Sequence, residues 1–235
     1  MSEVAVTTNV AKAAAELFLE ATAGAAAARG TANVALTGGS TAAPLYAELQ
    51  NRAVPWAALQ IFFTDERAVA PDDPLSNYRI ADDGILPKVR PDRIHRLYGE
   101  AQDLDAEAVR AAADLRSTLG TPPRLDLVLL GLGPDGHILS LFAGVPSSGM
   151  RGEDLVRHVA APTQVTPRVE RLTMTPMMVV TARMVVLQVA GTAKAEVLAR
   201  MLKGKEDLVA CPAQWLRRAS GRVVIVADAE ASSGL

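Results

Sequence analysis

The best candidate for acid–base chemistry is His137, which closes the segment GLGPDGH at residues 131–137. An imidazole with an ordinary pKa of about 6.5 can take up a proton near neutral pH. The glycines predict a close-turning loop after residues 125–130, which are apolar after Asp126, as in a strand buried on both faces. The other histidines, His95 and His158, stand in segments without glycine turns. We therefore predict that His137 is the general base.

The same segment matches the pattern GxGxxG, which is typical of dinucleotide-binding turns. A dinucleotide site is rejected because Asp135 would set a carboxylate against the pyrophosphate. No second strand with an acidic end follows within about twenty residues, and the motif lies in the middle of the chain.

A second group of residues suits an anion. Gly38, Gly39, Ser40 and Thr41 follow the predicted strand 33–37 and open the next helix. The glycines let the backbone approach a phosphate closely, and the helix directs free N–H groups and its positive dipole end at the same point. The alternative is a tight turn with Ser40 as the N-cap of the helix.

Cationic side chains follow other strands. Arg67 comes after Asp65 at the end of the predicted strand 59–64, and a guanidinium suits bidentate binding of phosphate. Lys194 is predicted in the first turn of a helix, where a cation opposes the dipole unless an anion binds. The alternatives are a surface ion pair for Arg67, an apolar-packing stem for Lys194, an exposed strand edge for Arg171 and a helix cap for Asn77.

A serine-hydrolase site ranks second among the enzyme mechanisms. Residues 38–42 approach the GxSxG turn but end in alanine, so Ser40, Asp65 and His137 are an alternative triad. Three scattered histidines and one cysteine give no zinc-site spacing, and we expect no metal.

Strands that alternate with helices must position these residues. Strands are predicted over 33–37, 59–64, 94–98, 125–130, 183–189 and 222–226, and helices over 10–30, 40–50, 76–86, 103–119 and 192–203. This order predicts one α/β domain over residues 1–235, with a parallel sheet between helices. The candidate residues should meet at its carboxyl edge. The weakly patterned stretch 143–164 is a surface loop, a linker or an incompletely assigned region.

Composition narrows the function classes. The chain has 235 residues, with 24 Lys and Arg against 26 Asp and Glu, and a net charge of -2, so we expect no nucleic-acid partner. No stretch of about eighteen apolar residues is uninterrupted, so no membrane span is expected. The lone Cys211 and an N-terminus without a basic region predict a cytoplasmic protein.

Taken together, the segments resemble the 6-phosphogluconolactonase family of the glucosamine-6-phosphate isomerase/6-phosphogluconolactonase superfamily. The matching pieces lie in family order from about residue 36 to the end and comprise LTGGST at 36–41, TDER at 64–67, SNYR at 76–79, GLGPDGH at 131–137, SLF at 140–142, RLT at 171–173 and Gly191 with Lys194. The resemblance implies a Rossmann-like α/β three-layer sandwich with a mostly parallel central sheet, and no cofactor.

The implied activity is hydrolysis of 6-phospho-D-glucono-1,5-lactone to 6-phosphogluconate in the oxidative pentose phosphate pathway. His137 would activate water. Asp135 or Asp65 would orient the imidazole of His137 or shape the loop that carries it. The phosphate would be held by the turn 38–41 with Arg67, Arg171 and Lys194, and Asp65 and Asn77 complete the expected substrate site. We expect a monomer or weak dimer whose partner is the phosphorylated sugar lactone.

The sequence departs from the family pattern at Ile138 and Leu139, where Thr and Ala are usual, and at Ala143, where Pro is usual. With Ile138, the segment resembles the motif Asp-Gly-His-Ile of the related glucosamine-6-phosphate deaminases. Those enzymes carry a catalytic Glu five residues after the histidine. Phe142 occupies that position here and cannot transfer a proton. A deaminase-like aldose–ketose isomerase and a non-catalytic phosphosugar sensor are the alternative functions.

Overall fold

The computed structural model describes residues 2–145 and 154–235, and within these ranges the named strands form two sheets. The larger sheet has seven parallel strands, in the spatial order β1 (Glu3–Val6), β10 (Arg222–Ala227), β9 (Met184–Val189), β6 (Leu127–Gly131), β2 (Ala32–Leu36), β3 (Leu59–Phe63) and β5 (Ile94–His95). The predicted α/β fold with a mostly parallel central sheet is confirmed.

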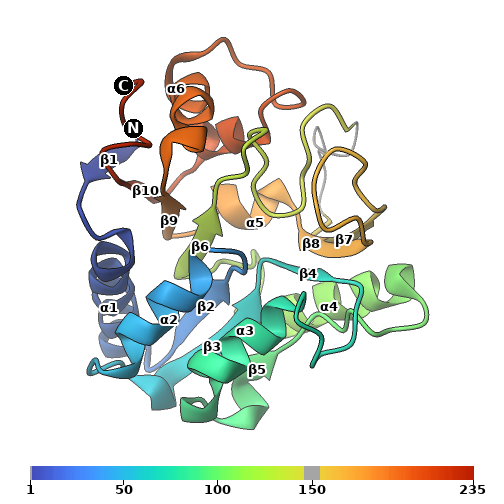
Figure 1. Ribbon diagram of the computed structural model, residues 1–235. Helices are drawn as coiled ribbons and strands as arrows, with labels where there is room; N and C mark the ends of the chain where they lie inside the picture. Colours follow the sequence, from blue (N-terminus) through green and yellow to red (C-terminus); the bar gives the residue numbers. More distant parts are fainter. Residues whose placement is uncertain (1, 146–153) are drawn as a thin grey trace.

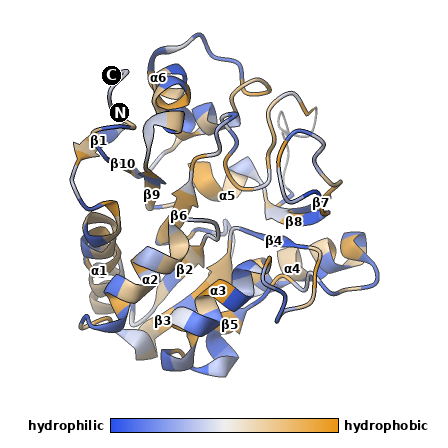
Figure 2. Ribbon diagram, viewed as in Figure 1, coloured by the Kyte–Doolittle hydropathy of each residue, from blue (hydrophilic) through white to orange (hydrophobic). Residues whose placement is uncertain are grey.

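The central strands are buried because helices flank the sheet. All residues of β9 are buried, as are all but the last residue of β6. These strands therefore have continuous apolar runs rather than an alternation of apolar and polar residues. Figure 2 shows the apolar colouring on β2, β6 and β9 in the middle of the molecule.

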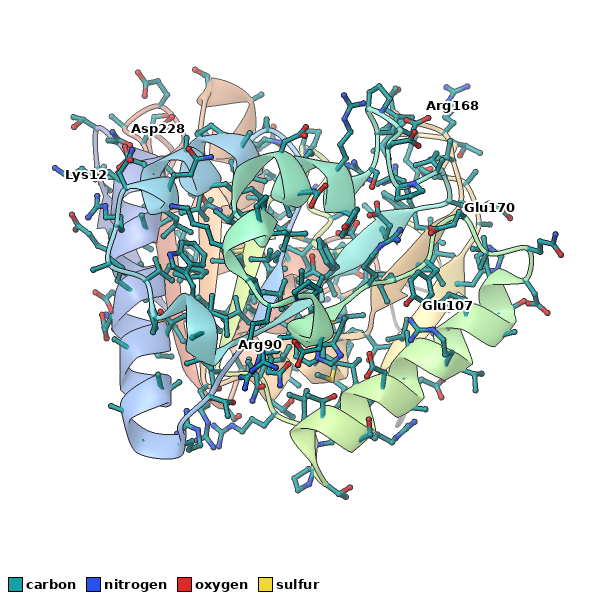
Figure 3. All side chains as sticks on the ribbon, turned by 90° about the horizontal axis from the view of Figure 1, so that it is seen from below. Lys12, Arg90, Glu107, Arg168, Glu170 and Asp228 are labelled. Atoms are coloured by element: carbon teal, nitrogen blue, oxygen red, sulfur yellow. The ribbon has the colours of Figure 1, made fainter. Side chains whose placement is uncertain are left out.

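The longest helix, α1 (Val10–Arg29), has the predicted caps. The Asn9 side chain accepts a hydrogen bond from the Lys12 N–H at 2.9 Å, and Gly30 ends the helix with a φ of 74°. α1 packs across β2, β6, β9 and β10 and beside α2 (Ala42–Gln50), which packs beside α3 (Asn77–Gly84). Figures 1 and 3 place α2 and α3 on one side of the sheet and α4 (Leu104–Leu119), which carries Glu107, on the other.

The smaller sheet was not predicted. It is antiparallel, in the order β4 (Asp65–Arg67), β8 (Arg171–Met174) and β7 (Val156–Val159). Thr64 joins it to the larger sheet, because its N–H donates to the Leu36 carbonyl at 2.8 Å and its carbonyl accepts from the Met174 N–H at 2.8 Å. The stretch 143–164 was therefore incompletely assigned, since it contains β7; its residues 146–153 lie outside the described residues.

Other elements differ from prediction at their ends. The strand predicted over 94–98 is only Ile94–His95, and β1 was not predicted. The helix predicted over 192–203 is a 3-10 helix, Thr192–Lys194, followed by α6 (Ala195–Lys203), and a short helix, α5 (Pro176–Val180), precedes β9. None of the helices in the described ranges is long and apolar enough to cross a membrane.

Candidate active site

A cavity of about 220 Å³ opens where the loops after β2, β3, β6 and β9 meet. The chain order reverses here, because β2 is followed in space by β3 and β5, and β6 by β9 and β10. Ligand crevices of open α/β sheets form at such switch points. All predicted site residues except Asp135 line this cavity: Gly38, Gly39, Ser40, Thr41, Asp65, Arg67, Asn77, His137, Arg171 and Lys194.

Asp135 lies against the imidazole of His137. Its Oδ1 is 2.6 Å from His137 Nδ1 and accepts from the His137 backbone N–H at 3.2 Å, and its Oδ2 accepts from the Ala143 N–H at 3.3 Å. Burial raises the pKa of this carboxyl, but the hydrogen bonds and charge of His137 outweigh burial and lower the pKa of Asp135 to about 2. An ionised carboxylate only accepts hydrogen bonds, so a neutral His137 carries its proton on Nδ1 and keeps the lone pair on Nε2.

Glycines and an arginine shape the loop that carries this pair. A Cβ at Gly133 would lie 2.0 Å from His137 Nδ1, so glycine leaves the space that the imidazole occupies. Gly136 has a φ of 98°, which other residues rarely adopt. Arg200 on α6 donates from Nη2 to the Asp135 carbonyl at 2.7 Å and thereby ties the loop to that helix. Arg200 was not among the predicted residues.

Asp65 does not contact the imidazole. Its Oδ2 accepts from Ser140 Oγ at 2.7 Å and its Oδ1 from Asn77 Nδ2 at 3.2 Å. Within the described ranges no hydrogen bond joins Asp65 or Ser40 to His137. The alternative triad of Ser40, Asp65 and His137 is therefore wrong, because a triad requires its acid on the histidine. Of the two carboxylates considered, only that of Asp135 contacts the imidazole of His137.

Arg67 and Arg171 lie on adjacent strands of the smaller sheet, directly opposite each other in the β4–β8 register. The alternative of an exposed strand edge for Arg171 is wrong, since this residue is only 4% exposed. The alternative surface ion pair of Arg67 is not formed with any described acidic residue. Its Nη1 instead donates to the Leu75 carbonyl. Both guanidinium groups therefore belong to the cavity wall.

The Arg171 guanidinium is held by backbone oxygens. Its Nε donates to the Val169 carbonyl at 3.1 Å and its Nη2 to the Pro167 carbonyl at 2.8 Å. Burial and the charge of Arg67 lower the pKa of Arg171, while the carboxylates of Asp65 and Glu66 act in the opposite direction. The site thus holds a positive charge that burial and repulsion disfavour, which an anion would compensate.

Glu66 fixes the segment that carries Arg67 and Asn77. Its Oε1 accepts from the N–H groups of Arg67 and Asn77, both at 2.7 Å. Its Oε2 accepts from the Tyr78 N–H at 2.7 Å and from Ser76 Oγ at 3.0 Å. Burial raises the pKa of Glu66 although these hydrogen bonds favour its charged form. Glu66 therefore satisfies two of the free N–H donors at the start of α3.

The glycine turn 38–41 packs closely on Asn77. A Cβ at Gly38 would lie 1.7 Å from Asn77 Oδ1, and Gly39 has a φ of 78°. The helix α2 begins at Ala42 with Thr41 at the N-cap position, so Ser40 is not the N-cap. Asn77 does more than begin α3, because its Nδ2 also donates to the Asp65 carbonyl at 2.9 Å. The turn and the start of α2 form a wall that favours an anion.

Lys194 ends the 3-10 helix Thr192–Lys194 and is the N-cap of α6, so it does not lie in the first turn of that helix. Burial lowers the pKa of Lys194, and the charge of Asp135 opposes that effect. The ammonium group is thus electrostatically coupled to the acid of the His137 pair.

Leu139, Ser140 and Gln188 are among the cavity residues that were not predicted. Leu139 has a φ of 58°, a strained value for a non-glycine residue. The Ser140 N–H donates to Thr173 Oγ1 at 3.1 Å, which adds to the link between the His137 loop and the smaller sheet. Gln188 is the only polar residue of β9. A lone amide at the carboxyl end of an apolar strand was the signal for Gln188 in the sequence.

A family model described as glucosamine-6-phosphate isomerases/6-phosphogluconolactonase matches residues 6–225. The chain belongs to this family. A 6-phosphogluconolactonase of Synechocystis is 34% identical over 238 aligned positions, which cover 99% of this chain and 91% of that protein. The solved structure of a 6-phosphogluconolactonase from Trypanosoma cruzi covers 100% of this chain and 97% of its own, with a TM-score of 0.91 and 27% identity.

The glucosamine-6-phosphate isomerase/6-phosphogluconolactonase fold is shared by enzymes of different activity. A solved structure described as a monomeric glucosamine-6-phosphate deaminase matches the full length of both chains with a TM-score of 0.84 and 24% identity. At this identity the likeness shows the fold alone, so the side chains must decide between activities. In the part of the chain that the structure describes, no three His, Cys, Asp or Glu residues gather to hold a metal ion.

Proposed function

We propose that this protein hydrolyses 6-phospho-D-glucono-1,5-lactone to 6-phospho-D-gluconate. One observation carries the proposal: His137 lines the same cavity as Arg67, Arg171 and Lys194. A phosphorylated lactone needs a general base near its carbonyl and positive charge near its phosphate. The 6-phosphogluconolactonases from Synechocystis and Trypanosoma cruzi, which this chain resembles along its whole length, support the same activity.

In the proposed reaction, His137 Nε2 takes a proton from water as the water oxygen attacks the lactone carbonyl. Asp135 stabilises the imidazolium that forms, because its carboxylate accepts from Nδ1 at 2.6 Å. The carbon–oxygen bond of the ring then breaks, and the proton passes from His137 to the ring oxygen. An activated ester needs no covalent intermediate, so a positioned water and one base suffice.

The remaining residues bind and orient the substrate. Arg67, Arg171 and Lys194 hold the phosphate together with the turn 38–41, so that binding at one end positions the carbonyl at the other. Backbone N–H groups of the glycine turns stabilise the oxyanion. Asp65 and Asn77, which hydrogen-bond each other, complete the wall.

Phe142 argues against amino-sugar deamination. Its ring packs edge-on against the His137 imidazole, with 5.2 Å between the ring centroids. An apolar ring at this place cannot exchange protons with a substrate, whereas deamination and isomerisation require a second acid–base group beside the histidine.

The test is a continuous proton-release assay with freshly generated 6-phosphogluconolactone. His137→Ala should lower turnover by about 10²–10⁴-fold. The affinity for 6-phosphogluconate, measured by calorimetry, should stay close to that of the wild-type protein. Equal turnover in the variant would remove His137 from the mechanism. Ligand binding without turnover in the wild-type protein would favour a sensor, and ammonia release from glucosamine 6-phosphate a deaminase.

We also propose that residues 1–235 form one domain and act in the cytoplasm as a monomer or weak dimer. One apolar cluster that includes Val186 of the larger sheet and Leu172 of the smaller one supports a single domain. The lone cysteine, Cys211, is buried and free, as suits a reducing compartment. Light scattering after size-exclusion chromatography measures the oligomeric state, and a stable tetramer would contradict this part of the proposal.

A further inference from the structure

Gln188 is a buried polar side chain that the proposed mechanism does not use. It lines the cavity, and it is only 1% exposed. Both its Oε1 and its Nε2 are buried and have no hydrogen-bond partner among the described residues. A buried amide without partners destabilises a folded protein, so its place in the wall of a ligand cavity calls for a functional reason.

A second buried glutamine shows how this fold satisfies an amide elsewhere. Gln214 is 0% exposed. Its Oε1 accepts from the Asp207 N–H at 2.6 Å, and its Nε2 donates to the carbonyls of Arg200 and Lys205 at 3.1 and 3.0 Å. The two glutamines thus differ in hydrogen bonding although both are buried, and only Gln188 lies in the cavity wall.

The register of the sheet places Gln188 beside the phosphate turn. Gln188 is the partner of Gly131 on β6, and neighbours in a parallel register project to the same face of a sheet. Gly131 has no side chain there, and a Cβ on it would lie 3.4 Å from Thr41 Oγ1. The Gln188 amide is therefore on the face that the turn 38–41 covers, next to a position left open by glycine.

The chemistry of the amide identifies its partner. Phosphate oxygens only accept hydrogen bonds, so a phosphate bound to Gln188 would leave Oε1 without a donor. In the proposed function, three cationic side chains already bind the phosphate. A sugar hydroxyl both donates and accepts, and two neighbouring hydroxyls satisfy Oε1 and Nε2 together. We propose that Gln188 is a specificity-determining residue that binds hydroxyl groups of the sugar-acid part of the ligand. This inference rests on the proposed function, because it assumes a phosphorylated polyhydroxy ligand in the cavity.

The test compares the wild-type protein with Gln188→Met, a change of similar volume, and with Gln188→Leu as a second apolar variant. Calorimetry measures the affinity for 6-phosphogluconate and for its 2-, 3- and 4-deoxy forms. Both variants should bind 6-phosphogluconate about tenfold more weakly. This difference from the wild-type protein should shrink for each deoxy form that lacks a recognised hydroxyl, and it should stay the same for a deoxy form that keeps both.

A stability measurement accompanies the binding test. The ligand-free Gln188 variants should have a Tm equal to or above that of the wild-type protein, because an unpartnered amide is replaced by an apolar group. Gln214→Met is the matched control and should lower Tm, because it removes three hydrogen bonds.

The inference is overturned if the Gln188 variants bind all four ligands as tightly as the wild-type protein does. It is also overturned if their affinity falls by the same factor for every ligand. Lactone turnover by the wild-type protein is measured separately. Turnover with no effect of Gln188 on hydroxyl selectivity overturns only the role of Gln188. Selective loss on the hydroxylated ligand without turnover supports the role of Gln188 and overturns the hydrolase.

Discussion

Arg67 and Arg171 stand directly opposite each other on neighbouring antiparallel strands, and both line the candidate site. Like charges in directly opposite positions of a sheet repel each other. Within the described ranges, neither guanidinium forms an ion pair with a carboxylate, and Arg171 is almost completely buried. An anion bound between the two side chains would relieve this repulsion, which makes the pair the strongest structural indication of a phosphate site.

Removal of Arg67 should therefore affect phosphorylated substrates alone. Arg67→Met should raise KM for 6-phosphogluconolactone by about 10–100-fold, the usual effect of losing a hydrogen bond to a charged group. KM for unphosphorylated glucono-1,5-lactone should change little. Arg90→Met is a suitable control, because Arg90 pairs with Asp92 on the surface. Equal effects of Arg67→Met on both lactones would show that Arg67 does not bind the phosphate.

Gly38 should tolerate no side chain while Asn77 is in place. Gly38→Ala sets a Cβ 1.7 Å from Asn77 Oδ1. The free energy of unfolding should fall by about 1–3 kcal/mol, and activity should fall with it. Gly24→Ala within α1 should instead raise the free energy of unfolding, measured in urea, by about 0.5–1 kcal/mol. No atom lies within 4 Å of the new Cβ. The double change Gly38→Ala with Asn77→Ala should cost less than the sum of its parts; additive losses would mean that the two residues do not clash.

Asp135 should make stability depend on acid pH. Its pKa is lowered from 3.8 to about 2 in the folded protein, mainly because hydrogen bonds from His137 outweigh burial. A carboxyl of this kind stabilises the fold above its unfolded-state pKa, and the contribution is lost as pH falls through 3.8 towards 2. Asp135→Asn should lower the free energy of unfolding by about 2 kcal/mol near neutral pH and by about half of that near pH 3. Urea unfolding across this range is the measurement, and a loss independent of pH would rule out the carboxylate charge as its source.

Ser140 should contribute to stability through Asp65. Its Oγ donates to Asp65 Oδ2 at 2.7 Å inside the protein. Ser140→Ala removes a donor from a buried carboxylate and should lower the free energy of unfolding by about 1–3 kcal/mol. Ser117→Ala, which removes a bond from an exposed Ser117 hydroxyl to the Asp114 carbonyl, should stay within about 0.5 kcal/mol. Thermal unfolding of the two variants side by side decides the matter, and similar losses would argue against a special role of Ser140.

Much of the fold could be predicted because its signals are local. The caps of α1 at Asn9 and Gly30 and the apolar runs of the central strands are visible in consecutive residues. The smaller sheet could not be predicted in this way. Its strand β4 is Asp65–Arg67, three charged residues without apolar alternation, and it pairs with Arg171–Met174 far along the chain. Local periodicity carries no information about such a pairing.

The candidate site could likewise be predicted in part. The residue types at the strand ends named part of the cavity lining, because parallel strands bring their carboxyl ends to one edge. Arg171, which lies in the smaller antiparallel sheet, entered the expected site only through the family resemblance. The sequence could not distinguish Asp135 from Asp65 as the partner of His137, since both follow strands at that edge. Gln188 was missed because it stands within an apolar strand, where periodicity indicates the element and not the amide.

The junction of the two sheets at Thr64 has a consequence for the range of substrates. His137 follows β6 of the larger sheet, whereas Arg67 and Arg171 belong to the smaller one. The separation of the base from the phosphate anchor is therefore set by the backbone pairing at Thr64 and by the loop after β6, which Ser140 ties to the smaller sheet. The site should therefore be selective for the length of the carbon chain of the substrate. A phosphorylated lactone one carbon shorter should bind through its phosphate, but its carbonyl should lie too far from the imidazole to react.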